Sequence, residues 1–121
     1  IESGLAEFET WLQRAGPRPL RVVGYAQRED QAYWLSARYE ALGHAHYMRS
    51  EYVDDAAGFA RFLEAARIDV VLLPEVFDPG AHSAAVFAHM AALARANQVV
   101  AHDVGAYVAY ELVPRTPPAP R

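Results

Sequence analysis

The run Ile68–Leu73 constrains the fold of this chain more than any other segment. Its last four residues, Val70–Leu73, are all apolar, so a strand formed here would turn apolar side chains to both faces of a sheet. That pattern is typical of a central strand in a parallel sheet that helices cover on each side. Pro74 follows and ends the strand. We therefore expect an α/β domain built around this segment.

Segments with helical and strand-like spacing alternate along the rest of the chain. Apolar residues recur every three to four positions in expected helices at 3–15, 30–42, 83–97 and after a cap at Asp54 or Asp55. Short β-branched or aromatic runs predict further strands at 20–25, 46–48, 99–102 and 107–113. The turn at 103–106 is too short for a crossover, so we expect the last two strands to form an antiparallel hairpin.

This order of elements predicts a three-layer, Rossmann-like open sheet. Four mostly parallel strands and an antiparallel C-terminal hairpin strand would carry helices on both faces. The 121 residues suit one domain. We assign residues 1–19 to an N-terminal helix and linker, 20–113 to the α/β domain, and 114–121 to a disordered, proline-rich tail.

Composition excludes several kinds of function. The absence of cysteine rules out a disulfide framework and a thiolate zinc site, and the absence of lysine rules out Schiff-base chemistry. A net charge of −4 argues against nucleic-acid binding, which usually needs a clustered basic face. No apolar run approaches the roughly 18 residues of a membrane span, and no signal-peptide pattern is visible at the start. Residues 24–29 lack the glycines of a dinucleotide-binding loop.

Polar residues gather where three of the expected strands end, after 20–25, after 68–73 and at the close of 99–102. These residues are Gln27, Arg28, Glu75, Asp78, His82, His102 and Asp103. In an open parallel sheet, ligands bind beyond the carboxyl ends of the strands. The sequence therefore predicts a ligand-binding site at this edge of the sheet.

Two interpretations of these polar residues are open. Their carboxylates and imidazoles would suit a divalent cation or acid–base chemistry. Alternatively they only cap helices, form turns and face water, since Asp78 lies in an Asp-Pro-Gly turn and Asp103 in the expected hairpin turn. We favour the second, because the spacing matches no catalytic motif, and assign no catalytic residue, metal ligand or cofactor. The pair His44 and His46 lacks an evident third ligand and is interpreted in the same way.

The adjacent aromatic residues Tyr33 and Trp34 cannot both face the buried side of the second expected helix. We expect one of them to reach a surface that contacts sugar, lipid or protein, including a second copy of the chain. The alternative, which we favour, is that the first helix packs against this region through Phe8 and Trp11.

Four features together suggest a family. They are the strand at 20–25, a helix ending at Gly43, the strand at 68–73, and a closing hairpin that ends in Val-Ala-Tyr-Glu-Leu-Val. This layout resembles the small α/β domain that follows the membrane-spanning part of bacterial polytopic glycosyltransferases of the dolichyl-phosphate-mannose and arabinose transferase type. The resemblance covers residues 20–113 and includes no catalytic motif, so no functional residue is transferred.

The resemblance implies a non-catalytic accessory domain on the extracytoplasmic face of a bacterial membrane, within a parent protein that is a glycosyltransferase. The domain would stabilise the membrane-embedded portion of the same polypeptide or contact a sugar or lipid-linked sugar acceptor. Two alternatives stay open. One is a free-standing cytoplasmic ligand-binding protein or small enzyme with its site at the carboxyl strand ends, and the other is an interaction module that forms a homodimer.

Overall fold

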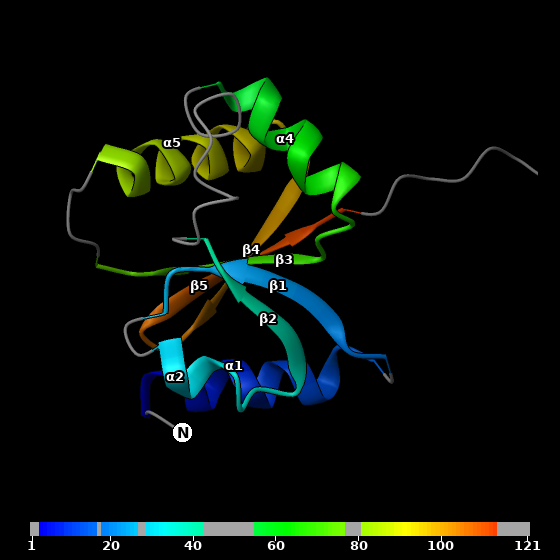
Figure 1. Cartoon of the computed structure of the whole chain (residues 1–121), viewed down its shortest axis with the longest axis vertical. Coiled ribbons are helices and arrows are strands. Elements are labelled where there is room, and N and C mark those ends of the chain that lie inside the picture. The colour runs from blue at the N-terminus through cyan, green and yellow to red at the C-terminus, as the bar shows by residue number, and fades with distance from the viewer. Residues whose placement is uncertain (1–2, 17, 27–28, 43–54, 77–80, 114–121) are drawn as a thin grey trace, which may run out of the picture.

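The computed structural model describes residues 3–16, 18–26, 29–42, 55–76 and 81–113. Its centre is a five-stranded mixed sheet in the order β2-β1-β3-β5-β4 (Figure 1). The strands are β1 (Leu20–Gly24), β2 (Ala37–Ala41), β3 (Val70–Pro74), β4 (Val99–Val104) and β5 (Tyr107–Leu112). β1 pairs in parallel with β2 and β3, whereas β5 is antiparallel to both β3 and β4. The predicted α/β class with an open sheet is confirmed, and β5 separates β4 from the three parallel strands.

β3 is the middle strand of the sheet, and all five of its residues are buried. Val70 and Leu72 belong to the core on one face of the sheet, and Val71 and Leu73 to the core on the other. The alternation follows from the two-residue period of a strand. The prediction that this apolar run forms a central strand covered on both sides is therefore confirmed.

Helices cover both faces of the sheet (Figure 1). One face carries α1 (Ser3–Arg14) and the single turn α2 (Glu29–Ala32), and the other carries α4 (Ala56–Ala65) and α5 (Ala81–Arg95). Leu5 and Phe8 of α1 anchor the first core, and Phe59 and Met90 anchor the second. Three of the expected helices are thus confirmed. So is the expected cap at Asp55, whose carboxylate accepts hydrogen bonds from two backbone N–H groups of the first turn of α4.

The expected helix at 30–42 is wrong beyond its first turn, because residues 37–41 form β2. Burial alternates along this segment: Tyr39 and Ala41 are buried, while Arg38 is exposed. Pairing with β1 satisfies the backbone hydrogen-bonding groups on the side of this edge strand that faces β1. The Glu9 carboxylate fixes the bend before β2, since it accepts hydrogen bonds of 2.6 and 2.7 Å from the backbone N–H and the hydroxyl of Ser36.

The C-terminal hairpin is confirmed, with a tighter turn than expected. β4 extends through Val104, and the turn consists of Gly105 and Ala106, where Gly105 adopts a left-handed φ of 73°. Asp103 therefore lies on the strand, opposite Val108, and not in a turn. The expected strand at 46–48, the helix stop at Gly43 and the histidine pair all fall within 43–54, outside the described residues.

Candidate functional site

The structure places only part of the predicted carboxyl-edge site. Gln27, Arg28 and Asp78 lie outside the described residues, and His82 belongs to α5 but its side chain is not described. Glu75 is exposed just after β3, where its backbone N–H donates a 2.8 Å hydrogen bond to the carbonyl of Ala106 in the hairpin turn.

His102 and Asp103 point to opposite faces of the sheet. They are neighbours on β4, whose residue Val99 packs beside α4 and α5 and whose residue Val104 packs beside α1. The His102 ring lies 5.1 Å from the Trp11 ring, and its Nε2 lies 3.1 Å from a Glu111 carboxylate oxygen. These partners tie α1 to the hairpin.

On the other face, burial and then the nearby charge of Asp103 raise the pKa of the Tyr110 phenol. The structure therefore does not bring His102 and Asp103 into one site. Within the described ranges, no group of three or more His, Asp or Glu side chains could hold a metal ion.

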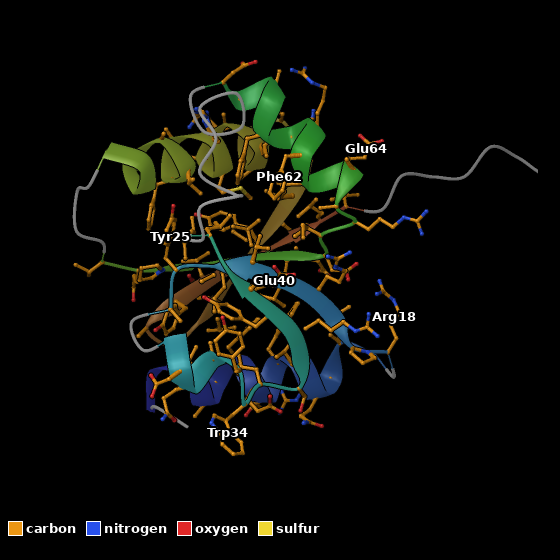
Figure 2. All side chains as sticks on the ribbon, viewed as in Figure 1. Arg18, Tyr25, Trp34, Glu40, Phe62 and Glu64 are labelled. Atoms are coloured by element: carbon orange, nitrogen blue, oxygen red, sulfur yellow. The ribbon has the colours of Figure 1, made fainter. Side chains whose placement is uncertain are left out.

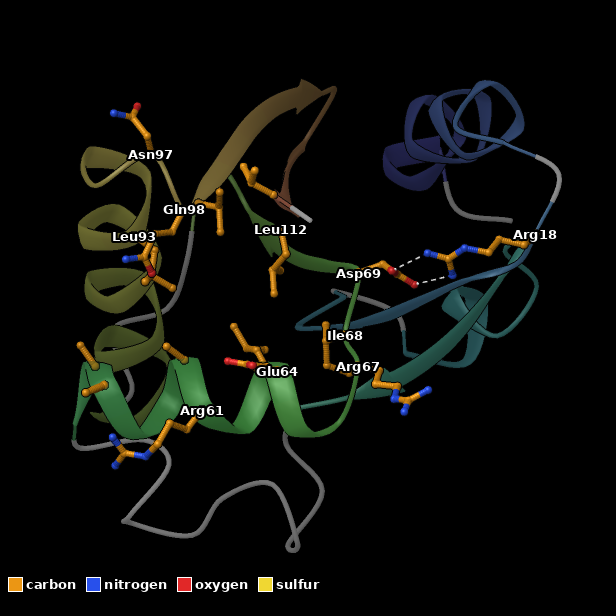
Figure 3. A pocket seen from close by; sticks show the side chains of 16 residues that line it. Arg18, Arg61, Glu64, Arg67, Ile68, Asp69, Leu93, Asn97, Gln98 and Leu112 are labelled. Atoms are coloured by element: carbon orange, nitrogen blue, oxygen red, sulfur yellow. Dashed lines mark hydrogen bonds and ion pairs between the residues drawn. The ribbon is translucent and has the colours of Figure 1, made fainter. Parts of the chain in front are cut away.

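A groove of about 1070 Å³ lies at the other end of the strands, opposite the predicted carboxyl-end site (Figure 3). Its lining comes from α4, the segment that leads into β3, the end of α5, the start of β4 and the end of β5. β3 and β4 are both antiparallel to β5, so these residues mark the amino ends of both strands. The site predicted from the sequence lies at the carboxyl ends of the strands, and no feature of the sequence predicted this groove.

The floor of the groove is apolar and its rim is polar. Leu63, Leu93 and Val99 of the apolar lining are buried side chains of the core beneath the groove, whereas Ala57 is exposed. In Figure 3, Leu112 points from β5 toward α4, and the Arg18–Asp69 pair lies at one end of the groove. Such an apolar strip framed by charged side chains is the usual composition of a surface that binds another molecule.

The Arg18–Asp69 pair is a fixed part of the rim. The guanidinium donates two hydrogen bonds, of 2.8 and 3.0 Å, to the two carboxylate oxygens, and the Arg21 backbone N–H donates a third of 2.8 Å. Burial raises the pKa of the Asp69 carboxyl, but these hydrogen bonds and the charge of Arg18 outweigh it, so the pKa is lowered. Asp69 therefore stays ionised, and its carboxylate binds the guanidinium of Arg18.

Two helices end at the groove with the same backbone motif. After α4, the backbone N–H of Arg67 donates to the backbone carbonyl of Glu64, and that of Ile68 donates to the carbonyl of Leu63. After α5, the N–H of Asn97 donates to Ala94 and that of Gln98 donates to Leu93, which is the same pattern. Arg67 and Asn97 accordingly adopt left-handed φ values of 55° and 59°. The expectation that Asn97 ends its helix is confirmed.

Trp34 points away from the molecule beside α2 and α1 in Figure 2, on the opposite side of the sheet from Glu64 of the groove. Trp34 is 78% exposed and Tyr33 is 54% exposed. Tyr33 also packs edge-on against Tyr39, with the ring centroids 5.8 Å apart. The prediction that one of the two reaches the surface is confirmed, and both do.

Comparison of the chain with protein-family models, curated proteins and solved structures gives no significant match. None of the helices in the described part of the chain is both long and apolar enough to cross a membrane.

Proposed function

We propose that the chain is a non-catalytic accessory domain whose groove binds another segment of polypeptide. The observation that carries this proposal is the apolar floor between α4 and the β4–β5 hairpin, open at the surface and framed by arginines. The part of this lining that is still exposed, such as Ala57 and Val113, gains free energy when a partner removes it from water, at about 25 cal/mol per Å².

The shape of the floor favours a polypeptide helix as the occupant. Ala56, Ala57 and Ala60 line the groove along α4. Small side chains let a second helix come as close as about 8–10 Å between axes, which is the usual distance in helix packing. The volume of about 1070 Å³ is at the upper end of what small-ligand pockets offer.

More specifically, we propose that the docked segment belongs to the membrane-embedded part of a glycosyltransferase. The domain then lies on the extracytoplasmic face of the membrane. The layout of β1, β3 and the hairpin supports this form. A further feature of the resemblance, a helix that ends at Gly43, does not support this form, because residues 37–41 form the strand β2 and not a helix.

A ligand-binding or enzymatic site at the carboxyl strand ends is the competing proposal. We place it second because His102 and Asp103 lie on opposite faces, so they act on no common ligand. Sugar contact or homodimer formation through Trp34 would use a different surface of the domain and is independent of binding in the groove.

Photo-crosslinking tests the proposal. The natural gene product would carry a benzophenone amino acid at Ala57, an exposed groove position, or at Ala6, an exposed position on α1 across the sheet. We expect Ala57 to crosslink to a hydrophobic segment of the same polypeptide, identified by mass spectrometry, and Ala6 not to. No crosslink from Ala57, or equal crosslinking from both positions, would overturn the proposal.

A further inference from the structure

Arg67 occupies a backbone conformation that suits its side chain poorly. Its φ of 55° lies in the left-handed region, which glycine and asparagine adopt most readily. The hydrogen bonds that end α4 require this conformation at position 67. The matching position after α5 carries asparagine, Asn97, so the fold meets the same need elsewhere with a better-suited residue.

The fold itself does not explain the arginine. The Arg67 side chain is exposed, and it makes no ion pair with any other residue that the structure describes. A strained residue without a stabilising contact is a reason to look for a function of its side chain.

Arg67 is also the rim arginine most available to a ligand. The guanidinium of Arg18 already donates two hydrogen bonds to Asp69. Arg61 lies 3.8 Å from Asp55, its helix-capping neighbour. Arg67 lines the groove beside Ile68, and its side chain extends outward from the rim, away from Leu112, in Figure 3. A guanidinium at this outer rim offers a planar fork of donors that matches a carboxylate.

We propose that Arg67 selects the docked segment by binding the carboxylate of an acidic side chain that the segment carries beside its apolar face. This inference rests on the proposed function, since it names the chemistry of the partner of the same groove. A phosphate-bearing ligand would use the same guanidinium, but the wall that α4 forms, about 15 Å long for ten residues and lined by alanine in its first half, fits a helix better.

The test uses two synthetic amphipathic helical peptides. One carries leucine, alanine and glutamate, and the other replaces each glutamate by glutamine. Titration into the ¹⁵N-labelled chain, followed by NMR, shows where each peptide binds. We expect the glutamate peptide to shift groove amides such as those of Ala60 and Val99, with an affinity at least tenfold above that of the glutamine peptide.

Arg67→Asn is the decisive variant, because asparagine tolerates the left-handed backbone. We expect it to lose at least tenfold in affinity for the glutamate peptide, with an unchanged or raised melting temperature. Arg67→Lys should keep part of the affinity, and Arg14→Gln, the matched control at an exposed arginine of α1 across the sheet from the groove, should change it less than threefold.

The outcomes separate the two proposals. If both peptides bind the groove equally and Arg67→Asn binds like the wild type, the role of Arg67 is wrong while the docking groove stands. If neither peptide shifts groove amides, the docking groove and the role of Arg67 both fail. Binding of inorganic phosphate at Arg67 without binding of the glutamate peptide would replace the carboxylate by a phosphate ligand and overturn this inference.

Discussion

Arg18 and Asp69, 51 positions apart in the chain, are joined by two parallel hydrogen bonds between guanidinium and carboxylate. The backbone of Asp69 extends this link, because its N–H donates to the carbonyl of Arg21 and its carbonyl accepts from Leu112. One residue thus connects the linker before β1, the entrance of β3 and the end of β5. The edge of the sheet that carries the groove is held in place by this connection.

Replacing Asp69 should weaken the fold measurably. Asp69→Asn removes the charge from an ion pair whose carboxylate is mostly buried, with 23% of its side chain exposed. We expect a loss of about 1–2 kcal/mol in the free energy of unfolding, measured with urea, since hydrogen bonds to charged groups contribute about 1.5–3 kcal/mol and the amide retains one acceptor. Asp103→Asn, at an exposed position, is the control and should stay within about 0.5 kcal/mol of wild type. Equal stability of Asp69→Asn and wild type would contradict this role.

Stability should fall in acid for a specific reason. The pKa values of Asp69 and Glu9 lie below their ordinary values of 3.8 and 4.5, as the net result of burial, which raises them, and hydrogen bonds, which lower them more. The unfolded chain therefore binds more protons in this range, so both groups stabilise the fold above their ordinary pKa values. That stabilisation is lost as the pH falls through the lowered, folded-state pKa values.

Melting temperatures between pH 7 and pH 2 measure this loss. The double variant Glu9→Gln with Asp69→Asn should start lower at pH 7, and the difference from wild type should shrink below pH 4. A difference that stays constant down to pH 2 would show that the two carboxylates do not cause the acid sensitivity.

Gly24 should tolerate no side chain. A Cβ built at this position would collide with the backbone carbonyl of Leu72, which accepts a hydrogen bond from Tyr25 and cannot move freely. Gly24→Ala should therefore cost about 3 kcal/mol or prevent folding, as expected for overpacking against a fixed backbone. Thermal denaturation measures the effect, and a melting temperature equal to that of wild type would contradict the close approach of β1 and β3.

The proline-rich end of the chain should contribute little to stability. Residues 115–121 have almost no apolar side chain to bury. A chain ending at Pro114 should melt within about 2 °C of the full chain. A loss of many degrees would indicate that this segment packs on the domain.

Local patterns in the sequence predict most of the elements. The apolar spacing of α1, α4 and α5 and the apolar run of β3 can each be recognised within the segment itself, without knowledge of its partners in the fold. β2 was missed because Leu35, Tyr39 and Leu42 are buried in the structure at a spacing that also suits a helix. Only long-range contacts decide between the two, namely pairing with β1 and the bonds between Glu9 and Ser36.

The groove was missed for a similar reason. Its lining residues come from separate parts of the chain that no motif connects, and they lie at the edge opposite to the one where parallel sheets usually bind ligands. The local hint was the position of Asn97 after its helix. An equivalent position at Arg67 is recognisable only from the backbone geometry, because arginine is not a usual helix-ending residue.

Hydrogen exchange tests the docking groove most directly. Mass spectrometry would compare amide exchange in the isolated chain with that in the natural gene product, prepared in the membrane in which the proposed function places it. We expect residues 56–67 of α4 and residues 97–99 to exchange more slowly in the natural product, while α1 exchanges at the same rate in both. Equal exchange rates along α4 would contradict the account, because a segment docked in the groove has to cover that helix.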